Sequence, residues 1–583
     1  MSLISIYQVL PRLFGNRNTT PKFNGSREEN GCGKMSDFTH DILLKIKGMG
    51  FSHIWYTGLI EHARCTDDSA FGIPAGNPHI IKGKAGSPYA ITDYYDIDPD
   101  LADSISNRLT EFADLVDRTH NAGLKFIIDF VPNHVARQYH SDIKPDTDFG
   151  LHDCKEWHFS PLNDFYYTAE PLHMPQNSGT TVDYQAPEYQ ENPARTTGND
   201  QFSAYPSVND WYETVKLNYG IDYMNNQRRQ FSPQPVLWQK MVDILLYWAQ
   251  KGVDAFRCDM AEMVPVEFWQ FAINKVKSQY PDIQFIAEVY NPIMYRDYIF
   301  RGGFDYLYDK VGLYDTLRAI TCYGTPAYNI TEVWKNLEGI NNKMLRFLEN
   351  HDEQRIASRF FANNAERAIP AMLVTATFNQ GALMVYFGQE VGEPADGESG
   401  YSGDDGRTTI FDYYNVPQFQ KWYNNGKADG ALLTATEQNL RDSYLSIIRL
   451  ATTKKCFTDG AFYDLMWANT NINNSKIYAY LRHINSEAML VIANFDANNS
   501  HNIKLHIPTH AWQTMGFSTN TEVELTSVYG DNQNIRQSTQ SIIDVGIFIN
   551  IQPTSGVVYK NYNFYHIFSL FDLNIHYNDN FDH

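Results

Sequence analysis

The chain has 583 residues, of which 68 are acidic and 47 are basic, so its formal net charge at pH 7 is −21. Nucleic acids and anionic membranes attract basic surfaces, so this charge argues against both kinds of partner. The hydrophobic share of 43% and the charged share of 20% are typical of a folded globular protein. Aromatic residues make up 14%, and the excess of Tyr favours surfaces on which flat apolar ligand faces, such as those of sugars, can stack.

The N-terminal segment and the cysteines favour a cytoplasmic protein. Residues 1–11 show neither the basic region nor the apolar stretch of a signal peptide, and no segment is apolar enough to span a membrane. The six cysteines have no C-x-x-C spacing, which argues against zinc and against a disulfide framework. We therefore predict a cytoplasmic location, or a periplasmic or secreted one if a signal was removed.

Strands alternate with helices through the first three quarters of the chain. In residues 45–56 a helix end, a glycine turn and an apolar strand follow one another. Further strands of this kind are predicted within 125–130, 253–258, 284–288, 344–348 and 382–387. The alternation indicates parallel βα units, and their number predicts an α/β fold, the (β/α)₈ or TIM barrel.

Two segments depart from this alternation. Residues 135–216 are rich in Pro, Asn, Asp and aromatics and lack helical periodicity, which predicts an irregular subdomain inserted after strand 3. After a helix at 435–454, strands near 476–482 and 488–495 follow each other directly, which predicts an antiparallel β-sandwich. The predicted domains are the barrel (1–134 and 217–458), the insert (135–216) and the C-terminal β-domain (459–583).

Polar side chains stand at the ends of several predicted strands. They are Asp129, Arg257, Asp259, Glu288, His351 and Asp352. In a closed barrel these ends meet at one mouth, where carboxylates and an Arg would shift each other's pKa values as acid–base and nucleophilic chemistry requires. Helix capping would explain any one of these residues, but the combined set favours an active site.

Six segments resemble conserved segments of the α-amylase family of glycoside hydrolases, and they occur in the order found in that family. Four are similar to the signature segments of that family: residues 128–134 (IDFVPNH), 252–261 (GVDAFRCDMA), 287–289 (AEV) and 347–352 (FLENHD). Two flanking patterns, 87–94 (SPYAITDY) and 385–390 (VYFGQE), strengthen the resemblance. It covers most of the chain, including the barrel, the insert and the tail.

The resemblance implies a catalytic role for three carboxyl groups. Asp259 would be the nucleophile, Glu288 the general acid/base and Asp352 the stabiliser of the transition state. Arg257, on the same strand as Asp259, would keep the nucleophile ionised. Glu288 must carry a proton, so we expect it in a drier and more negative setting.

The predicted substrate-binding residues surround this set. They are Tyr89, His134, Arg257, His351 and Asp129. By the resemblance, the two histidines would donate hydrogen bonds to sugar hydroxyls and Tyr89 would stack on the sugar face. A lone His or Tyr is more often a core residue, so these assignments depend on the family pattern.

The resemblance also implies a structural Ca²⁺, although the chemistry itself requires no cofactor. Asn133 matches a common ligand of that ion. Many relatives have a Lys-His pair after the nucleophile, and the His carbonyl binds the ion; Glu262 and Met263 stand at those positions here. The family's short motif near the end of the insert reads KLNYGIDY at residues 216–223.

The leading hypothesis is a retaining hydrolase of α-1,4-glucosidic bonds in starch or maltooligosaccharides. If a sugar replaces water as the acceptor, the protein is instead a transglycosylase or an isomerase, such as a 4-α-glucanotransferase or a trehalose-forming enzyme. The third hypothesis is a non-catalytic, carbohydrate-binding member of the family. The presence of all three catalytic carboxyl residues argues against it. The expected partner is an α-glucan or oligosaccharide; oligomeric state and endo or exo action are left open.

Overall fold

The computed structural model describes residues 3–176, 178–179, 186–398, 400, 403–485 and 487–563. Its central feature is a closed barrel of eight strands, all paired in parallel. Around the barrel the strands are β1 (Ser5–Val9), β2 (His53–Tyr56), β5 (Lys125–Phe130), β10 (Ala255–Cys258), β11 (Gln284–Ala287), β12 (Tyr306–Tyr308), β13 (Met344–Arg346) and β14 (Ala382–Tyr386). The predicted TIM barrel is confirmed.

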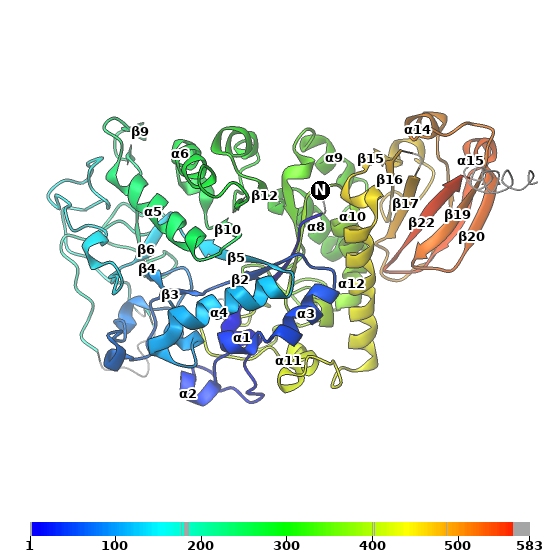
Figure 1. Ribbon diagram of the computed structural model, residues 1–583. Coiled ribbons are helices and arrows are strands. Elements are labelled where there is room, and N and C mark those ends of the chain that lie inside the picture. Colours follow the sequence, from blue (N-terminus) through cyan, green and yellow to red (C-terminus); the bar gives the residue numbers. More distant parts are fainter. Residues whose placement is uncertain are drawn as a thin grey trace, which may run out of the picture.

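Amphipathic helices follow most barrel strands and cover the outside of the barrel (Figure 1). The longer ones are α3 (His40–Gly48), α4 (Arg108–Asn121), α5 (Val236–Gln250), α6 (Val266–Lys277), α8 (Asp315–Tyr323), α9 (Asn329–Asn336), α10 (Ile369–Thr377) and α12 (Ala435–Thr453). In α4 the buried residues Phe112, Leu115 and Val116 recur at helical spacing and face the barrel. The chain then turns at Gly123, whose φ of 74° suits glycine, and enters β5.

The barrel strand β12 was not predicted from the sequence. The strand β12 has three residues, two of them Tyr, and pairs with β11 on one side and β13 on the other. β13 is equally short but belongs to the mostly apolar run 344–348, whereas Asp305 and Asp309 flank β12 and leave no such run. The pairing of β12 therefore depends on the neighbouring strands, which close the barrel around it.

The segment between β5 and α5 contains short strands and long irregular stretches. Strand β6 (His134–Ala136) pairs antiparallel with β7 (Thr214–Lys216), and β8 (Ile221–Asp222) pairs with β9 (Arg228–Arg229). Because β5 is the third barrel strand along the chain, this segment leaves the barrel where the sequence predicts an insert. A second excursion, after β2, forms the hairpin of β3 (Ile60–His62) and β4 (Ile91–Ile97).

The C-terminal strands form a separate antiparallel β-domain at the right of Figure 1, beyond α12. Its main sheet has the order β15 (Ala461–Asp464), β16 (Ile477–Ile484), β17 (Glu487–Asn494), β22 (Ser555–Asn563), β19 (Glu522–Tyr529) and β20 (Asn534–Ser538). A second sheet pairs β18 (His501–Leu505) with β21 (Ile547–Ile551). Antiparallel pairing throughout confirms the predicted change of architecture after the barrel.

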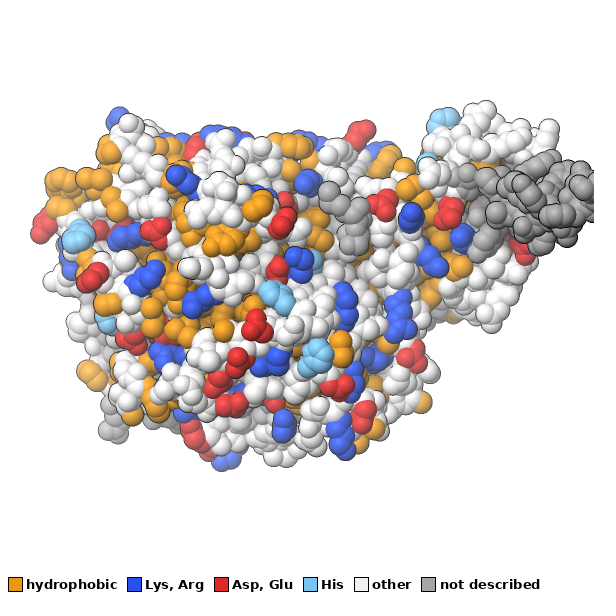
Figure 2. Space-filling model, in the orientation of Figure 1, with side chains coloured by type: hydrophobic (Ala, Val, Ile, Leu, Met, Phe, Trp, Pro, Cys, Tyr) orange, Lys and Arg blue, Asp and Glu red, His pale blue; other side chains and the backbone are white. Residues whose placement is uncertain are grey.

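The surface carries charges of both signs. On the face drawn in Figure 2, Lys and Arg side chains lie interspersed with Asp and Glu. Acidic and basic groups are therefore mixed on that face. Within the described parts of the chain, no helix combines the length and the apolar composition needed to cross a bilayer.

Candidate active site

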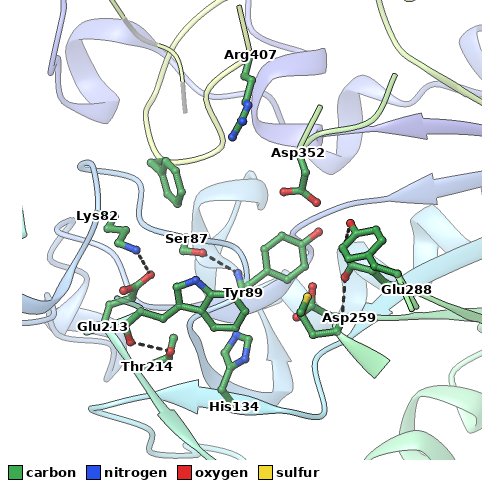
Figure 3. Close-up of a pocket in the computed structure, with 14 residues that line it drawn as sticks. Lys82, Ser87, Tyr89, His134, Glu213, Thr214, Asp259, Glu288, Asp352 and Arg407 are labelled. Atoms are coloured by element: carbon green, nitrogen blue, oxygen red, sulfur yellow. Dashed lines mark hydrogen bonds and ion pairs between the residues drawn. The ribbon is translucent and has the colours of Figure 1, made fainter. Parts of the chain in front are cut away.

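A cavity of about 230 Å³ opens at the C-terminal ends of the barrel strands, beside the insert. It is lined by Lys82, Ser87, Tyr89, His134, Trp211, Glu213, Thr214, Asp259, Met260, Glu288, Tyr290, Asp352, Arg407 and Phe411. Figure 3 shows Asp259, Glu288 and Asp352 grouped around the ring of Tyr89. This end of the barrel is where barrel enzymes carry their active sites.

Arg257 is the centre of the buried charge network. Its Nη1 donates to Asp259 Oδ1 at 2.7 Å, and its Nη2 donates to Glu288 Oε2 at 2.7 Å. A longer contact of 3.4 Å joins Nη1 to Asp129 Oδ1, across the register that pairs β10 with β5. One fully buried guanidinium thus holds three of the carboxyl groups that the sequence placed at strand ends.

Burial dominates the protonation of the carboxyl cluster. The pKa of Asp259 is raised well above its ordinary value because the group is buried, and Glu288 and Asp352 raise it further against the opposing charge of Arg257. Burial and the nearby Glu288 raise the pKa of Asp352 to about 7. Arg257 lowers the pKa of Asp259, in the direction expected of a group that keeps the nucleophile ionised, but burial outweighs it and the pKa stays above its ordinary value.

Glu288 is surrounded by hydrogen-bond donors. Besides Arg257, the Met260 N–H donates to Oε2 at 2.8 Å and the Tyr290 hydroxyl donates to Oε1 at 2.5 Å. Met260 also adopts a left-handed conformation, with φ of 41°, which is uncommon for a residue other than glycine. The surroundings of Glu288 are therefore dry, as expected, but less negative than expected.

Tyr89 and His351 lie against each other beside Asp352. Gln8 Nε2 donates to His351 Nδ1 at 2.7 Å, so the ring proton belongs on Nε2, which lies 3.1 Å from Asp352 Oδ2. The Tyr89 hydroxyl is 2.5 Å from the same Nε2 and donates to Asp129 at 3.3 Å. Burial and the charge of Arg257 hold the pKa of His351 well below its ordinary value, so this imidazole stays neutral.

His134 reaches the cavity from the insert side. Its ring lies 5.2 Å from that of Trp211, measured between centroids. Burial and the charge of Lys216 lower the pKa of His134 to about 3, so it is also neutral at physiological pH. His134 lines the cavity and can offer one N–H to an uncharged ligand, whereas the ring N–H of His351 already faces Tyr89 and Asp352 and His351 is not part of the lining.

A comparison with known protein families identifies the family of this chain. Residues 8–410 match the family described as "Alpha amylase, catalytic domain". The chain belongs to the α-amylase family. Its similarity to particular α-amylase family members is distant in sequence and extensive in fold.

Two relatives and one solved structure illustrate the low sequence identity and the shared fold. The chain is 22% identical to "Alpha-amylase 3" of Dictyoglomus thermophilum, over 70% of this chain and 74% of that protein. It is 23% identical to "Alpha-1,4-glucan:maltose-1-phosphate maltosyltransferase" of Picrophilus torridus, over 86% of this chain but 62% of the relative. The crystal structure of an α-amylase from Geobacillus thermoleovorans complexed with acarbose superposes with a TM-score of 0.61, at 19% identity, covering 96% of this chain and 98% of that one.

The position of Asn133 does not suit the Ca²⁺ that the α-amylase resemblance implies. Its Oδ1 accepts a hydrogen bond from Lys216 Nζ at 2.5 Å, and its Nδ2 donates to the Gly198 carbonyl. Ca²⁺ requires about six to eight oxygen ligands, whereas here an ammonium group already lies against the side-chain oxygen. As arranged, these residues do not fit the ion.

Several cavity residues were not predicted from the sequence. Lys82 Nζ and Glu213 Oε1, which both line the cavity, form an ion pair of 2.9 Å. These residues come from loops that carry no family motif. Tyr290 could have been found, because it lies two residues after Glu288, directly after the short motif at residues 287–289.

Proposed function

We propose that the protein is a retaining enzyme that hydrolyses α-1,4-glucosidic bonds in starch or maltooligosaccharides. The observation that carries this proposal is the double contact of Arg257, which is 2.7 Å from both Asp259 and Glu288. A single guanidinium that contacts two carboxyl groups keeps them close. Retaining glycosidases hold their two carboxyls about 5–5.5 Å apart, whereas inverting enzymes separate them by about 6.5–9.5 Å to admit a water molecule.

In this mechanism Asp259 attacks the anomeric carbon while Glu288 protonates the glycosidic oxygen. The C–O bond to the leaving sugar breaks, and a covalent glycosyl–Asp259 intermediate forms. Glu288, now ionised, removes a proton from water, which attacks the anomeric carbon and releases Asp259. Two inversions leave the product in the α-configuration.

The remaining residues suit an uncharged substrate. We propose that the neutral imidazole of His134 donates to a sugar hydroxyl, that Tyr89 presents its ring to a sugar face, and that His351 positions Tyr89 and Asp352 from behind the cavity. Asp352 would stabilise the positive charge that develops on the ring in the transition state. Arg257 and Asp129 hold these groups in place from below the cavity.

The test is the anomeric configuration of the first products. Maltoheptaose would be incubated with the enzyme and the reducing-end anomers followed by ¹H NMR before mutarotation. We expect the α-anomer to be released first. Early release of the β-anomer would refute the retaining mechanism.

Transfer to a sugar acceptor is a second candidate. The relative from Picrophilus torridus, whose name describes a maltosyltransferase, matches 86% of this chain. The same glycosyl–Asp259 intermediate would then react with a sugar hydroxyl instead of water. Chromatography of the products from a single maltooligosaccharide distinguishes the two, because only transfer makes chains longer than the starting sugar.

We also propose that the enzyme works in the cytoplasm. Its six cysteines are free thiols. A reducing compartment preserves such thiols. Cell fractionation with an antibody against the protein would test the location, and recovery in the medium or periplasm would contradict it.

A further inference from the structure

Lys216 is a buried lysine at the junction of the barrel and the insert. Its side chain is 1% exposed, and it lies on β7 opposite His134 of β6. Its Nζ is 2.5 Å from Asn133 Oδ1, 2.7 Å from Asp200 Oδ1 and 3.4 Å from the Met263 carbonyl oxygen. These three oxygens belong to separate parts of the chain: the end of β5, the insert, and the loop after β10.

The surroundings match the needs of an ammonium group. An ammonium has three N–H donors and no acceptor, and three oxygens surround this one. The carboxylate of Asp200 balances its charge, and the ring of Tyr223 lies 5.5 Å away. A buried charge is stable in a protein only when it is paired and hydrogen-bonded in this way.

We propose that the ammonium group of Lys216 is the built-in cation of this junction and replaces the structural Ca²⁺, so that folding of the enzyme does not depend on Ca²⁺. Asn133 and the Met263 carbonyl are the two ligands that the family resemblance assigns to the ion, and Lys216 contacts both. A covalently attached cation cannot be removed by a chelator or by dilution.

The same group supports the catalytic cavity. Asn133, held by Lys216 through Oδ1, places its Nδ2 3.1 Å from His134 Nδ1 and donates to the Gly198 carbonyl at 2.8 Å. The lysine therefore connects the insert to a cavity residue through one side chain. In this arrangement the orientation of His134 is independent of any bound metal.

The test measures thermal unfolding of the full-length protein with excess EDTA and with millimolar Ca²⁺. We expect the Tm of the wild-type protein to be the same in both, and no stoichiometric Ca²⁺ by inductively coupled plasma mass spectrometry. Lys216→Ala should lower the Tm by a few degrees, because it leaves Asp200 and Asn133 without their partner. It also vacates a position lined by oxygens, so Ca²⁺ should restore part of this loss.

Lys240→Ala is the matched control. Lys240, on α5, also joins the barrel to the insert, through Asp164 Oδ2 at 2.7 Å and the Asp148 carbonyl at 3.1 Å. Its loss should lower the Tm without creating a response to Ca²⁺.

A fall in the wild-type Tm on adding EDTA that Ca²⁺ reverses would overturn the proposal. A Tm of Lys216→Ala equal to that of the wild type would overturn it as well. A loss of Tm in Lys216→Ala that Ca²⁺ does not change would also refute it, because Lys216 would then be an ordinary buried ion pair. If Lys216→Ala does not fold, the comparison of the wild type with and without EDTA still decides the question.

Discussion

The guanidinium of Arg257 is the positive charge that the buried carboxyl groups of the site contact. It lies between Asp259 and Glu288 and is packed within 5.3–5.5 Å of the rings of Trp55, Tyr89 and Tyr308. These rings exclude water from around the charge. Arg257 lowers the pKa values of Asp259 and Asp352, but burial outweighs this effect, and with a pKa of about 7 Asp352 can keep a proton near neutral pH.

Asp259→Asn should abolish turnover without affecting the fold. An amide of the same shape cannot form the glycosyl–enzyme bond, so we expect kcat to fall by at least about 10⁴-fold. Steady-state rates on maltoheptaose and circular dichroism would measure the two effects. Asp243→Asn, on the exposed side of α5, is the control and should keep normal activity. A variant of Asp259 that retains a tenth of the wild-type rate would contradict the assignment.

Tyr290→Phe should lower kcat with little change in KM. The lost hydroxyl donates to Glu288 Oε1, and a hydrogen bond to a charged group contributes about 1.5–3 kcal/mol. We therefore expect a decrease of kcat of roughly 10-fold to 100-fold on maltooligosaccharides, with an unchanged Tm. A rise of KM alone would show that Tyr290 binds the substrate rather than orienting Glu288.

Asp352→Asn should stabilise the protein more at high pH than at low pH. An unfolded Asp titrates near about pH 3.9, whereas the pKa of Asp352 in the fold is raised to about 7. As the pH rises between these values the unfolded state ionises first, so the native state loses stability; this loss is complete above about pH 7 and absent below about pH 4. Asn cannot ionise and avoids it. Tm values measured at about pH 4 and pH 8 should show a larger gain at pH 8, and an equal gain at both would contradict the shifted pKa.

At the scale of elements, the pairing of β6 with β7 decides where the insert contributes to the cavity. The register places His134 opposite Lys216, with Thr214 at the other end of the pair. Gly198 packs against both strands, since a Cβ there would lie 2.4 Å from Thr214 Oγ1 and 3.0 Å from His134 Cβ. The absence of a side chain at this position is therefore a condition for the close contact of the insert with the barrel.

Gly198→Ala should displace His134 or Thr214 and lower kcat/KM. Contacts this short force the neighbouring atoms to move. A shift of even about 1 Å in a substrate-positioning residue can reduce the rate by roughly 100-fold. Kinetics on maltoheptaose would measure the effect. Gly48→Ala, near the end of α3 where a Cβ meets nothing within 4 Å, is the control and should leave the rate and the Tm unchanged or raise the Tm slightly. Wild-type kinetics in Gly198→Ala would show that the insert can adjust.

At the scale of the whole molecule, the β-domain is joined to the barrel by buried polar contacts as well as apolar packing. Arg482 on β16 donates to the Thr377 carbonyl at the end of α10, and also to the carbonyls of Phe457 and Gly460. The Tyr480 hydroxyl is 2.5 Å from Thr377 Oγ1. Carbonyl groups in such a dry interface need these donors.

Arg482→Met should weaken this interface without changing catalysis. Three carbonyls would lose a buried charged donor, which we expect to lower the free energy of unfolding by about 2–4 kcal/mol. Urea unfolding followed by tryptophan fluorescence would measure the change, while kcat should stay normal because Arg482 is outside the cavity. Arg536→Met, at an exposed position of the same domain, is the control. An unchanged free energy of unfolding would mean that apolar packing alone joins the two parts.

Much of the fold and of the carboxyl set could be predicted from the sequence, because both depend on local patterns. Apolar strands that end in a carboxylate, an Arg or a His can be recognised one segment at a time. The strand β12 could not be predicted in this way, since its three residues lie between Asp305 and Asp309 and are not part of a longer apolar run. Lys82 and Glu213 were also missed, because loops without a motif bring them to the cavity.

The sequence by itself determined the barrel, the position of the insert, the β-domain and the candidate residues Asp259, Glu288 and Asp352. It did not determine their electrostatic setting, because pKa values depend on burial and on neighbours distant in the chain. Only the tertiary structure decided that Arg257 contacts both Asp259 and Glu288. It also placed Lys216 against Asn133, where the sequence suggested Ca²⁺, because these residues meet only when the insert folds back onto the barrel.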